Sequence, residues 1–319
     1  MRLRDDAAGP AGYADRSLVS ALVRTARPKQ WMKNVLVFAA PGAAGVLTHG
    51  RALRESALAF VLFCLAASGT YFVNDAIDAA ADRHHPVKRH RPVAAGDLSA
   101  LSATVIGGLA TLGSIAIALA VGRSKLAIVL AVYLGVQASY VVWLKHQPIF
   151  DIACVASGFV LRAIAGGVAA GVPLSNWFLI VASSGSLLMV SGKRYAESLT
   201  LGGQAGDHRP TLDIYTQPFL RYVRSVSSGV AMTAYFLWAF EKAGATGPGS
   251  QPRQVVASTH GSLWFELSVV PFALAILRYA LLLDGGHGGA PEEVILGDRT
   301  LQILGLILVG LFAIGLYVT

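Results

Sequence analysis

The stretch YFVNDAIDAAADRHHPVKRHRP, residues 71–92, decides how the rest of the chain is interpreted. It follows an apolar run and places Asn74, Asp78 and Asp82 four residues apart. Four residues advance a helix by about 400°, so these side chains follow one helix face with a drift of about 40° per step. Acids at the C-terminal end of a helix meet the unfavourable end of its dipole, which indicates that an external cation compensates them.

The chemistry of this stretch suits a magnesium ion and a phosphorylated substrate. Mg²⁺ prefers oxygen ligands and is commonly held by one or two carboxylates together with substrate phosphates. The cations that follow, Lys88, Arg89 and Arg91, suit phosphate oxygens. We therefore predict a Mg²⁺–diphosphate site in which the three spaced oxygen-bearing side chains are the metal ligands. Simple capping or solvation of a helix end is the alternative interpretation.

The composition indicates a membrane protein. Of the 319 residues, 54% are hydrophobic and only 14% are charged, whereas soluble domains carry about 25% charged residues. The apolar runs predict an all-α polytopic membrane protein with nine transmembrane helices, at about 32–48, 56–74, 99–121, 126–143, 149–170, 176–192, 221–240, 262–283 and 300–318. The net charge of +8 does not indicate a nucleic-acid partner, because the cations lie in loops between these runs.

The basic residues also predict the orientation of the chain. Most of them fall at the N-terminus or near the loops 75–98, 193–220 and 284–299, on one side of the predicted membrane. The positive-inside rule places that side in the cytoplasm, for a multi-pass protein of the plasma membrane. We expect residues 1–23 to be a disordered cytoplasmic segment. Residues 24–319 are expected to form one domain within the lipid bilayer, with a cytoplasmic cavity; a homo-oligomer is left open.

The motif also resembles that of a known family. NDAIDAAAD, at 74–82, is similar to the NDxxDxxxD signature that binds the Mg²⁺–diphosphate in the UbiA superfamily of intramembrane prenyltransferases. Further stretches resemble one actinobacterial branch of it, namely RPKQWMKNVLVFAAP at 27–41, DIACVASGFVLRAIAGGV at 151–168, SLLMVSGKRYAE at 186–197 and LRYALLLDGGHGGAPEEVILGDR at 277–299. The resemblance covers nearly the whole chain from Arg24 onward.

The resemblance implies a UbiA-like bundle and a transferase activity. The branch in question transfers 5-phosphoribose from 5-phosphoribosyl 1-diphosphate (PRPP) to a polyprenyl (decaprenyl) phosphate, with Mg²⁺ as cofactor. It releases diphosphate and yields a precursor of cell-wall arabinan. By this resemblance the catalytic residues would be Asn74, Asp75, Asp78 and Asp82. The role of Asp75 would be to contact the sugar or to orient a ligand.

Further residues complete the predicted site. The donor PRPP is expected to meet Lys33, Tyr71, Lys88, Arg89, Arg91 and Lys145. Most of the superfamily carries a second acidic motif where this chain has GKRYAE at 192–197, and cations there favour a lipid monophosphate. The residues assigned to that phosphate are Arg162, Lys193, Arg194, Tyr195 and Glu197. Arg162 falls inside an apolar run, where a charge is by default functional, and an interhelical tie is the alternative.

Two other functions fit parts of the sequence. An ordinary member of the superfamily would move a prenyl group from a prenyl diphosphate to an aromatic acceptor. A transporter or lipid flippase would place charges near span centres and contain inverted repeats. The charges here gather at span ends, and Arg162 alone matches the transporter pattern.

Overall fold

The computed structural model describes residues 18–201, 211, 214–242, 259–285 and 291–317. All regular elements in this part of the chain are helices, which confirms the all-α prediction there. The long helices are α3 (Gly50–Ile77), α6 (Ala100–Ala120), α7 (Ser124–Val142), α8 (Phe150–Ala170), α9 (Asn176–Leu201), α11 (Gln217–Lys242), α12 (Thr259–Asp284) and α14 (Arg299–Tyr317). The shorter elements are α1 (Leu18–Ala26), η1 (Pro28–Phe38), α2 (Ala39–Ala43), α4 (Ala79–His84), η2 (Lys88–His90), α5 (Pro92–Ala95), η3 (Leu144–His146) and α13 (Pro291–Gly297).

The helices make this a multi-pass membrane protein, although the predicted count of nine spans is not confirmed. Within the described ranges, six helices are long and apolar enough to cross a bilayer: α3, α6, α7, α8, α12 and α14. The other three predicted runs fall on η1–α2, α9 and α11. Helices α9 and α11 carry several serines and arginines, and η1–α2 is an irregular segment that ends at Ala43.

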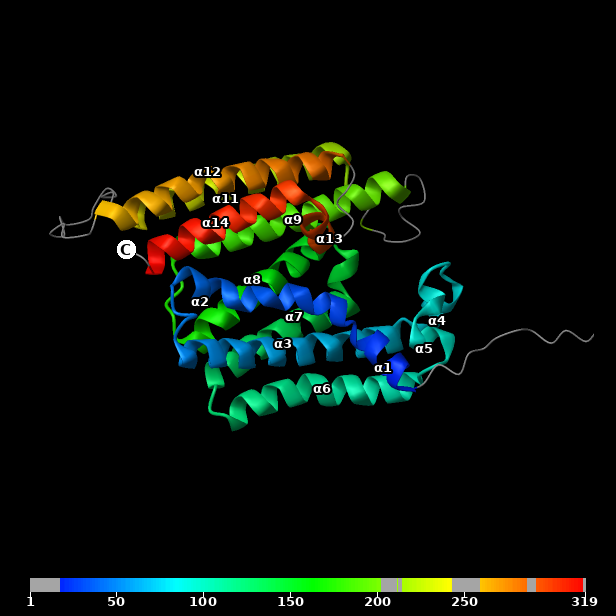
Figure 1. The fold of residues 1–319 in the computed structure, drawn as a ribbon. Coiled ribbons are helices and arrows are strands. Elements are labelled where there is room, and N and C mark those ends of the chain that lie inside the picture. The colour runs from blue at the N-terminus through cyan, green and yellow to red at the C-terminus, as the bar shows by residue number, and fades with distance from the viewer. Residues whose placement is uncertain (1–17, 202–210, 212–213, 243–258, 286–290, 318–319) are drawn as a thin grey trace, which may run out of the picture.

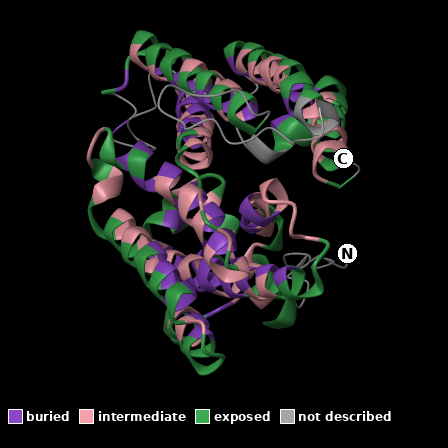
Figure 2. Ribbon diagram, turned by 90° about the vertical axis from the view of Figure 1, so that its left-hand side faces the viewer, coloured by how far each residue is buried: buried purple, intermediate pink, exposed green. Residues whose placement is uncertain are grey.

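The long helices form two groups. In the first group, α3 packs against α6, α7, α8 and η1. In the second group, α11 packs against α9 and α12, and α12 packs against α14. The groups meet where α8 packs against α9, and they appear as the lower and upper layers of the molecule (Figure 1). Many outward-facing residues of both layers are exposed, as expected for helices that face lipid (Figure 2).

Two glycines let neighbouring elements approach closely. A Cβ at Gly166 on α8 would stand 1.7 Å from the backbone oxygen of Val37 on η1, so only glycine fits there. A Cβ at Gly192 on α9 would stand 2.5 Å from Leu283 on α12. Small residues at such crossings are the usual means of packing helices in membranes. The absence of a side chain at Gly192 therefore allows the end of α12 to pack closely against the GKRYAE segment of α9.

One boundary differs from the prediction. Residues 1–17 lie outside the described part of the chain, but residues 18–23, expected to be disordered, lie in the helix α1. This helix buries Ala21 and Thr25, and Ala21 packs with Phe72 of α3 in one apolar cluster. Burial of this stripe offsets the entropy cost of ordering the segment. The polar residues that precede it in the sequence make this helix hard to predict from sequence.

Candidate functional site

The acidic motif lies where α3 gives way to α4. Helix α3 ends at Ile77, and Asp78 lies between it and α4. Backbone bonds from the Asp78 N–H to the Asn74 oxygen (2.9 Å) and from the Asp82 N–H to the Asp78 oxygen (2.8 Å) keep the helical spacing through the junction. The backbone therefore follows the predicted path, but the three side chains have different partners.

Asn74 and Asp78 form a pair that remains partly accessible. The Asn74 amide nitrogen donates to Asp78 Oδ2 at 3.1 Å. Lys145, from η3 between α7 and α8, places its Nζ 3.6 Å from Asp78 Oδ1. This donation turns the amide nitrogen of Asn74 toward the carboxylate, so its oxygen is left to bind another group. The structure thus brings together three of the residues predicted for the donor site.

Asp75 and Asp82 are buried and are bridged by Arg91. The Arg91 Nη1 lies 2.7 Å from Asp82 Oδ2 and 3.2 Å from Asp75 Oδ1. Arg27 adds a second cation, with its Nη2 2.5 Å from Asp75 Oδ1 and its guanidinium 4.7 Å from the centre of the Tyr71 ring. Each buried carboxylate is therefore paired, as burial of a charge requires.

Arg27 was missed as a site residue, although it begins the RPKQW stretch. It adopts the left-handed region at φ 53°, which residues other than glycine enter infrequently. Its contacts with Asp75 and Tyr71 hold it in place at the junction of α1 and η1. The only sequence signal was a cation directly before a proline, and that pattern does not reveal an ion pair with a residue on α3.

The oxygen ligands fit a magnesium ion in part. In the described ranges, no three His, Cys, Asp or Glu residues lie close enough to hold a metal by themselves. Asn74 and Asp78, however, offer two adjacent oxygen-bearing side chains, and Mg²⁺ sites need few protein ligands when phosphates supply the rest. Asp82, predicted as a third ligand, is turned instead to Arg91. The donor set therefore suits a metal that arrives with a phosphorylated substrate.

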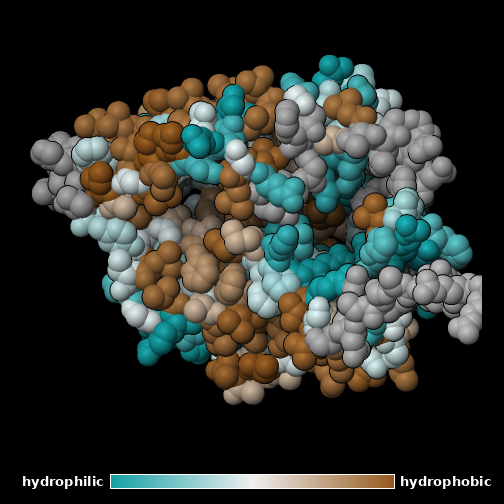
Figure 3. Space-filling model, turned by 45° about the vertical axis from the view of Figure 1, so that its right-hand side comes forward, coloured by the Kyte–Doolittle hydropathy of each residue, from teal (hydrophilic) through white to brown (hydrophobic). Residues whose placement is uncertain are grey.

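The remaining predicted donor cations lie at the rim of this end of the bundle. Lys88 and Arg89 belong to η2, where Lys88 is half-buried and Arg89 is exposed. Lys33 on η1 donates to Gln30 Oε1 at 2.5 Å. Polar residues gather around a recess between two bands of apolar surface on this face (Figure 3).

An apolar cavity of about 470 Å³ begins beside Lys33. Its walls come from η1, α2, α8, α9 and α13. Its other lining residues are Met32, Val35, Leu36, Phe38, Ala39, Phe159, Met189, Ile295 and Leu296. One cation at the edge of an otherwise apolar space suits a molecule with an anionic head and a hydrocarbon tail.

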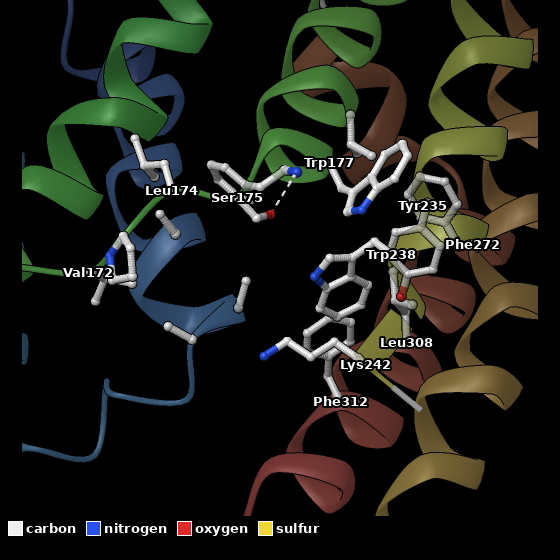
Figure 4. A pocket seen from close by; sticks show the side chains of 16 residues that line it. Val172, Leu174, Ser175, Trp177, Tyr235, Trp238, Lys242, Phe272, Leu308 and Phe312 are labelled. Atoms are coloured by element: carbon white, nitrogen blue, oxygen red, sulfur yellow. Dashed lines mark hydrogen bonds between the residues drawn. The ribbon is translucent and has the colours of Figure 1, made fainter. Parts of the chain in front are cut away.

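A second cavity of about 260 Å³ is lined in part by Ala40 and Ala43 of α2. Its aromatic lining includes Trp177, Trp238 and Phe312, with Lys242 at its edge (Figure 4). It contains none of the residues predicted for the site. Trp238 and Phe312 stack with centroids 5.2 Å apart, which ties α11 to α14.

The GKRYAE segment is organised differently from the prediction. Arg194 is 2% exposed and is held by Asp151 (3.2 Å) and Glu197 (2.9 Å). Asp151 is completely buried and also accepts hydrogen bonds from Thr211 and Tyr215. Arg194 and Glu197, assigned from sequence to the lipid phosphate, thus form an internal network that joins α8 to α9.

Arg162 also has internal partners in place of a phosphate. Its Nε meets Asn34 Oδ1 at 2.6 Å, its Nη1 meets the Gly158 oxygen at 2.7 Å and its Nη2 meets the Tyr133 hydroxyl at 3.1 Å. All three nitrogens are therefore used inside the first helix group. These contacts match the interhelical tie that was the alternative interpretation of this residue.

Of the remaining lipid-phosphate candidates, Tyr195 is buried and Lys193 is half-buried on α9. The Arg224 guanidinium lies 4.2 Å from the centre of the Tyr195 ring. Arg224 was not singled out from the sequence, because an arginine near the start of an apolar helix resembles an ordinary positive-inside residue.

Comparisons with known proteins agree with this architecture. The chain is 44% identical over 315 residues to a protein of Mycolicibacterium smegmatis named decaprenyl-phosphate phosphoribosyltransferase, covering 97% of this chain and 96% of the relative. A protein of the same name from Corynebacterium glutamicum is 45% identical over 312 residues, covering 95% of this chain and 89% of the relative.

Among solved structures, a UbiA homolog from Archaeoglobus fulgidus bound to DMAPP and Mg²⁺ has the same fold. The TM-score is 0.68 at 17% sequence identity, over 93% of this chain and 98% of that chain. A sequence model of the UbiA prenyltransferase family matches residues 35–296. With relatives at this identity over nearly its full length, the chain belongs to the UbiA prenyltransferase family.

Proposed function

We propose that this protein transfers 5-phosphoribose from PRPP to a polyprenyl phosphate, decaprenyl phosphate by analogy with the named relatives. The observation that carries the proposal is the Asn74–Asp78 pair beside Lys145, at the same end of the bundle as the cavity that begins at Lys33. The pair suits a magnesium-bound diphosphate, and the cavity suits an acceptor with a long hydrocarbon tail.

The leaving diphosphate is assigned to the first helix group. Asn74 and Asp78 would hold Mg²⁺, which when bound neutralises the charge that gathers on the departing diphosphate. Lys145 would contact diphosphate oxygens from the opposite side of Asp78. Asp82 and Asp75 act indirectly, because their ion pairs fix Arg91 and Arg27 at the edge of the site. Lys88 and Arg89 on η2 would meet the 5-phosphate as the sugar enters.

The acceptor needs little activation. A phosphate monoester carries about −1.5 to −2 charges at neutral pH, so its oxygen is already a nucleophile without a general base. That oxygen attacks C1 of the ribose, the bond from C1 to diphosphate oxygen breaks, and the electron pair leaves with the diphosphate. No proton has to be moved, which agrees with a site built from cations and metal ligands. Exclusion of water by the apolar cavity would favour the lipid over hydrolysis.

The lipid tail is assigned to the cavity between η1, α2, α8, α9 and α13. Its walls carry no acid, and Lys33 marks the end at which the phosphate would lie. Phe159 on α8 and Met189 on α9 also line the cavity. A flexible chain of isoprene units would be held there by burial of apolar area.

The topology that we propose has nine spans. Six are the apolar helices, and the other three are α9, α11 and the η1–α2 segment. In it the N-terminus and the cavity face the cytoplasm of the plasma membrane. Single cysteines at exposed Arg89 and at exposed Leu119, introduced into a chain in which Cys64 and Cys154 are serine, test this orientation. A membrane-impermeant maleimide should label position 119 in intact cells and position 89 only after lysis. The reverse pattern would contradict the topology.

The transfer itself is tested with membranes that contain the protein, labelled PRPP and polyprenyl phosphate. Label in the ribose should enter the lipid fraction, and it should not do so with the Asp78→Ala variant. Parallel incubations with a prenyl diphosphate and an aromatic acceptor test the alternative family activity. If the aromatic acceptor is prenylated while labelled ribose phosphate never enters the lipid fraction, the proposal is wrong.

A further inference from the structure

Arg224 on α11 is a buried cation with unused donors. The residue is only 6% exposed, and its Nη2 contacts Asp284 Oδ1 at the end of α12. Its Nε and Nη1 are buried and have no hydrogen-bond partner among the residues that the structure describes. A buried guanidinium with unpaired N–H groups is costly, so the arrangement indicates a partner that binds there.

The position of Arg224 is fixed by two neighbouring helices, α9 and α12. Tyr195 on α9 stacks against its guanidinium, 4.2 Å from the ring centre, and is itself 7% exposed. Gly192, one turn earlier on α9, admits Leu283 of α12 at a distance that a Cβ would forbid. The next residue of α12 is Asp284, which therefore reaches Arg224. A planar cation held by an aromatic face and one carboxylate is preorganised to receive an anion.

The Asp284 contact does not account for the burial of Arg224. The Asp284 side chain is 59% exposed, so solvent screens the pair and its stabilising effect is small. The other two arginines that are buried in the described ranges differ from Arg224. Arg162 uses all three guanidinium nitrogens within the protein, and Arg194 is held between Asp151 and Glu197. Two nitrogens of Arg224 have no such partner in the described part of the chain.

We infer that Arg224 binds a phosphate group, through the two nitrogens that have no partner among the described residues. The inference rests on the proposed function and extends it, because it places one substrate phosphate against the second helix group. Phosphate oxygens accept from arginine more strongly than neutral groups do, which suits a buried donor set. The same chemistry is offered by the acceptor lipid and by PRPP, so the experiment has an arm for each.

The test measures steady-state kinetics with the two substrates varied in turn. In Arg224→Gln, the KM of one substrate should rise about ten-fold or more, as expected for loss of a charged hydrogen bond, while the KM of the other stays within about two-fold. The substrate whose KM rises identifies the phosphate. Arg221→Gln, an exposed arginine one turn earlier on α11, is the matched control and should leave both KM values unchanged.

A second arm uses no turnover. Purified wild-type and variant proteins are melted with and without PRPP plus Mg²⁺, polyprenyl phosphate, or vesicles of an anionic phospholipid. Arg224→Gln should melt no lower than wild type without ligand, because it removes unpaired buried donors. Its melting temperature should rise less than that of wild type with one of the two substrates. A reduced rise with the phospholipid vesicles alone, and with neither substrate, would overturn the inference.

The two arms separate the possible failures. If wild type transfers no ribose phosphate, the proposed function fails, and the melting arm still decides whether Arg224 binds a phosphate. If Arg224→Gln does not fold, Arg224→Lys takes its place, since it keeps the charge but not the spread of donors. The inference is overturned if the folded variant shows unchanged KM values and unchanged ligand shifts, or if it melts lower while binding both substrates normally.

Discussion

The two helix groups each contain a buried aspartate paired with arginine, and they use it in opposite ways. In the first group, Asp75 binds Arg27 and Arg91, and the neighbouring Asn74–Asp78 pair stays accessible. In the second group, Asp151 is enclosed with Arg194. The first group thus presents oxygen acceptors, whereas the donors without a described partner in the second group are those of Arg224, which suits a metal-bound diphosphate on one side and a bare phosphate on the other.

The enclosed pair has a further stabilising partner. Tyr215 donates its hydroxyl to Asp151 and accepts the backbone N–H of Ile149 at 2.5 Å. Burial, together with the nearby Asp151, raises the pKa of Tyr215 above its usual value. The hydroxyl therefore remains protonated and remains a donor throughout the physiological range. We therefore interpret this network as a structural connection between α8 and α9 that does not contact substrate.

If the first group holds the diphosphate, Asp78→Ala should reduce transfer by about 10³-fold, or about 4 kcal/mol of transition-state stabilisation. Its melting temperature should stay close to that of wild type, because Asp78 is half-buried and pairs only loosely with Lys145. Initial rates in membranes give the comparison. Glu293→Ala, at an exposed acid on α13, should be fully active. Full activity of Asp78→Ala would remove the metal role assigned to it.

If the second pair is structural, Arg194→Ala should destabilise the fold by about 3 kcal/mol, because it leaves the buried Asp151 short of its cation. Thermal unfolding in detergent measures the loss. The KM for polyprenyl phosphate, measured at a temperature at which the variant is folded, should change little. A large KM increase with unchanged stability would instead return Arg194 to the lipid-phosphate site.

The contact between η1 and α8 is tested by Gly166→Ala, which should cost about 2 kcal/mol. The added methyl would lie 1.7 Å from the Val37 backbone oxygen, so η1 has to move and the Asn34–Arg162 bond beside it weakens. Gly135→Ala on α7 is the control, since nothing lies near its Cβ position. Equal melting temperatures for the two variants would show that the close approach is not required.

A small pH effect is expected where α13 meets α14. The hydrogen bond from Arg278, at 2.7 Å, and the N–H of Leu301 lower the pKa of Asp298. A carboxylate with a lowered folded pKa stabilises the fold above its unfolded pKa of about 3.9, and the effect is lost as pH falls through the folded value. Asp298→Asn should melt slightly lower than wild type at pH 7. The difference should disappear in acid, and a difference that grows in acid would contradict this assignment.

Much of the fold follows from the sequence alone. The apolar runs locate α3, α6, α7, α8, α12 and α14, because a helix must satisfy its own backbone in lipid. The motif at 74–82 begins at the end of α3, where the preceding apolar run predicts it. Helices α9 and α11, which were also predicted as spans, are less apolar because they carry serines and arginines, and neither is among the six described helices that are long and apolar enough to cross a bilayer.

The side-chain pairing does not follow from the sequence. Asp151 and Arg194 are 43 residues apart, and Arg27 and Asp75 are 48 residues apart. Helical periodicity gives the face on which a residue lies, but it does not say which faces meet. Arg91 reaches Asp75 and Asp82 only because the chain after α4 turns back through η2. Charged residues predicted to bind substrate therefore divide into structural and accessible ones only in three dimensions.

The position of the diphosphate in a complex with PRPP and Mg²⁺, determined by electron cryo-microscopy, tests the assignment of the two helix groups most directly. We predict the diphosphate and its metal next to Asn74 and Asp78, with Lys145 on the far side. Diphosphate density beside Arg224 and Tyr195, with Asn74 and Asp78 free of metal, would contradict the account.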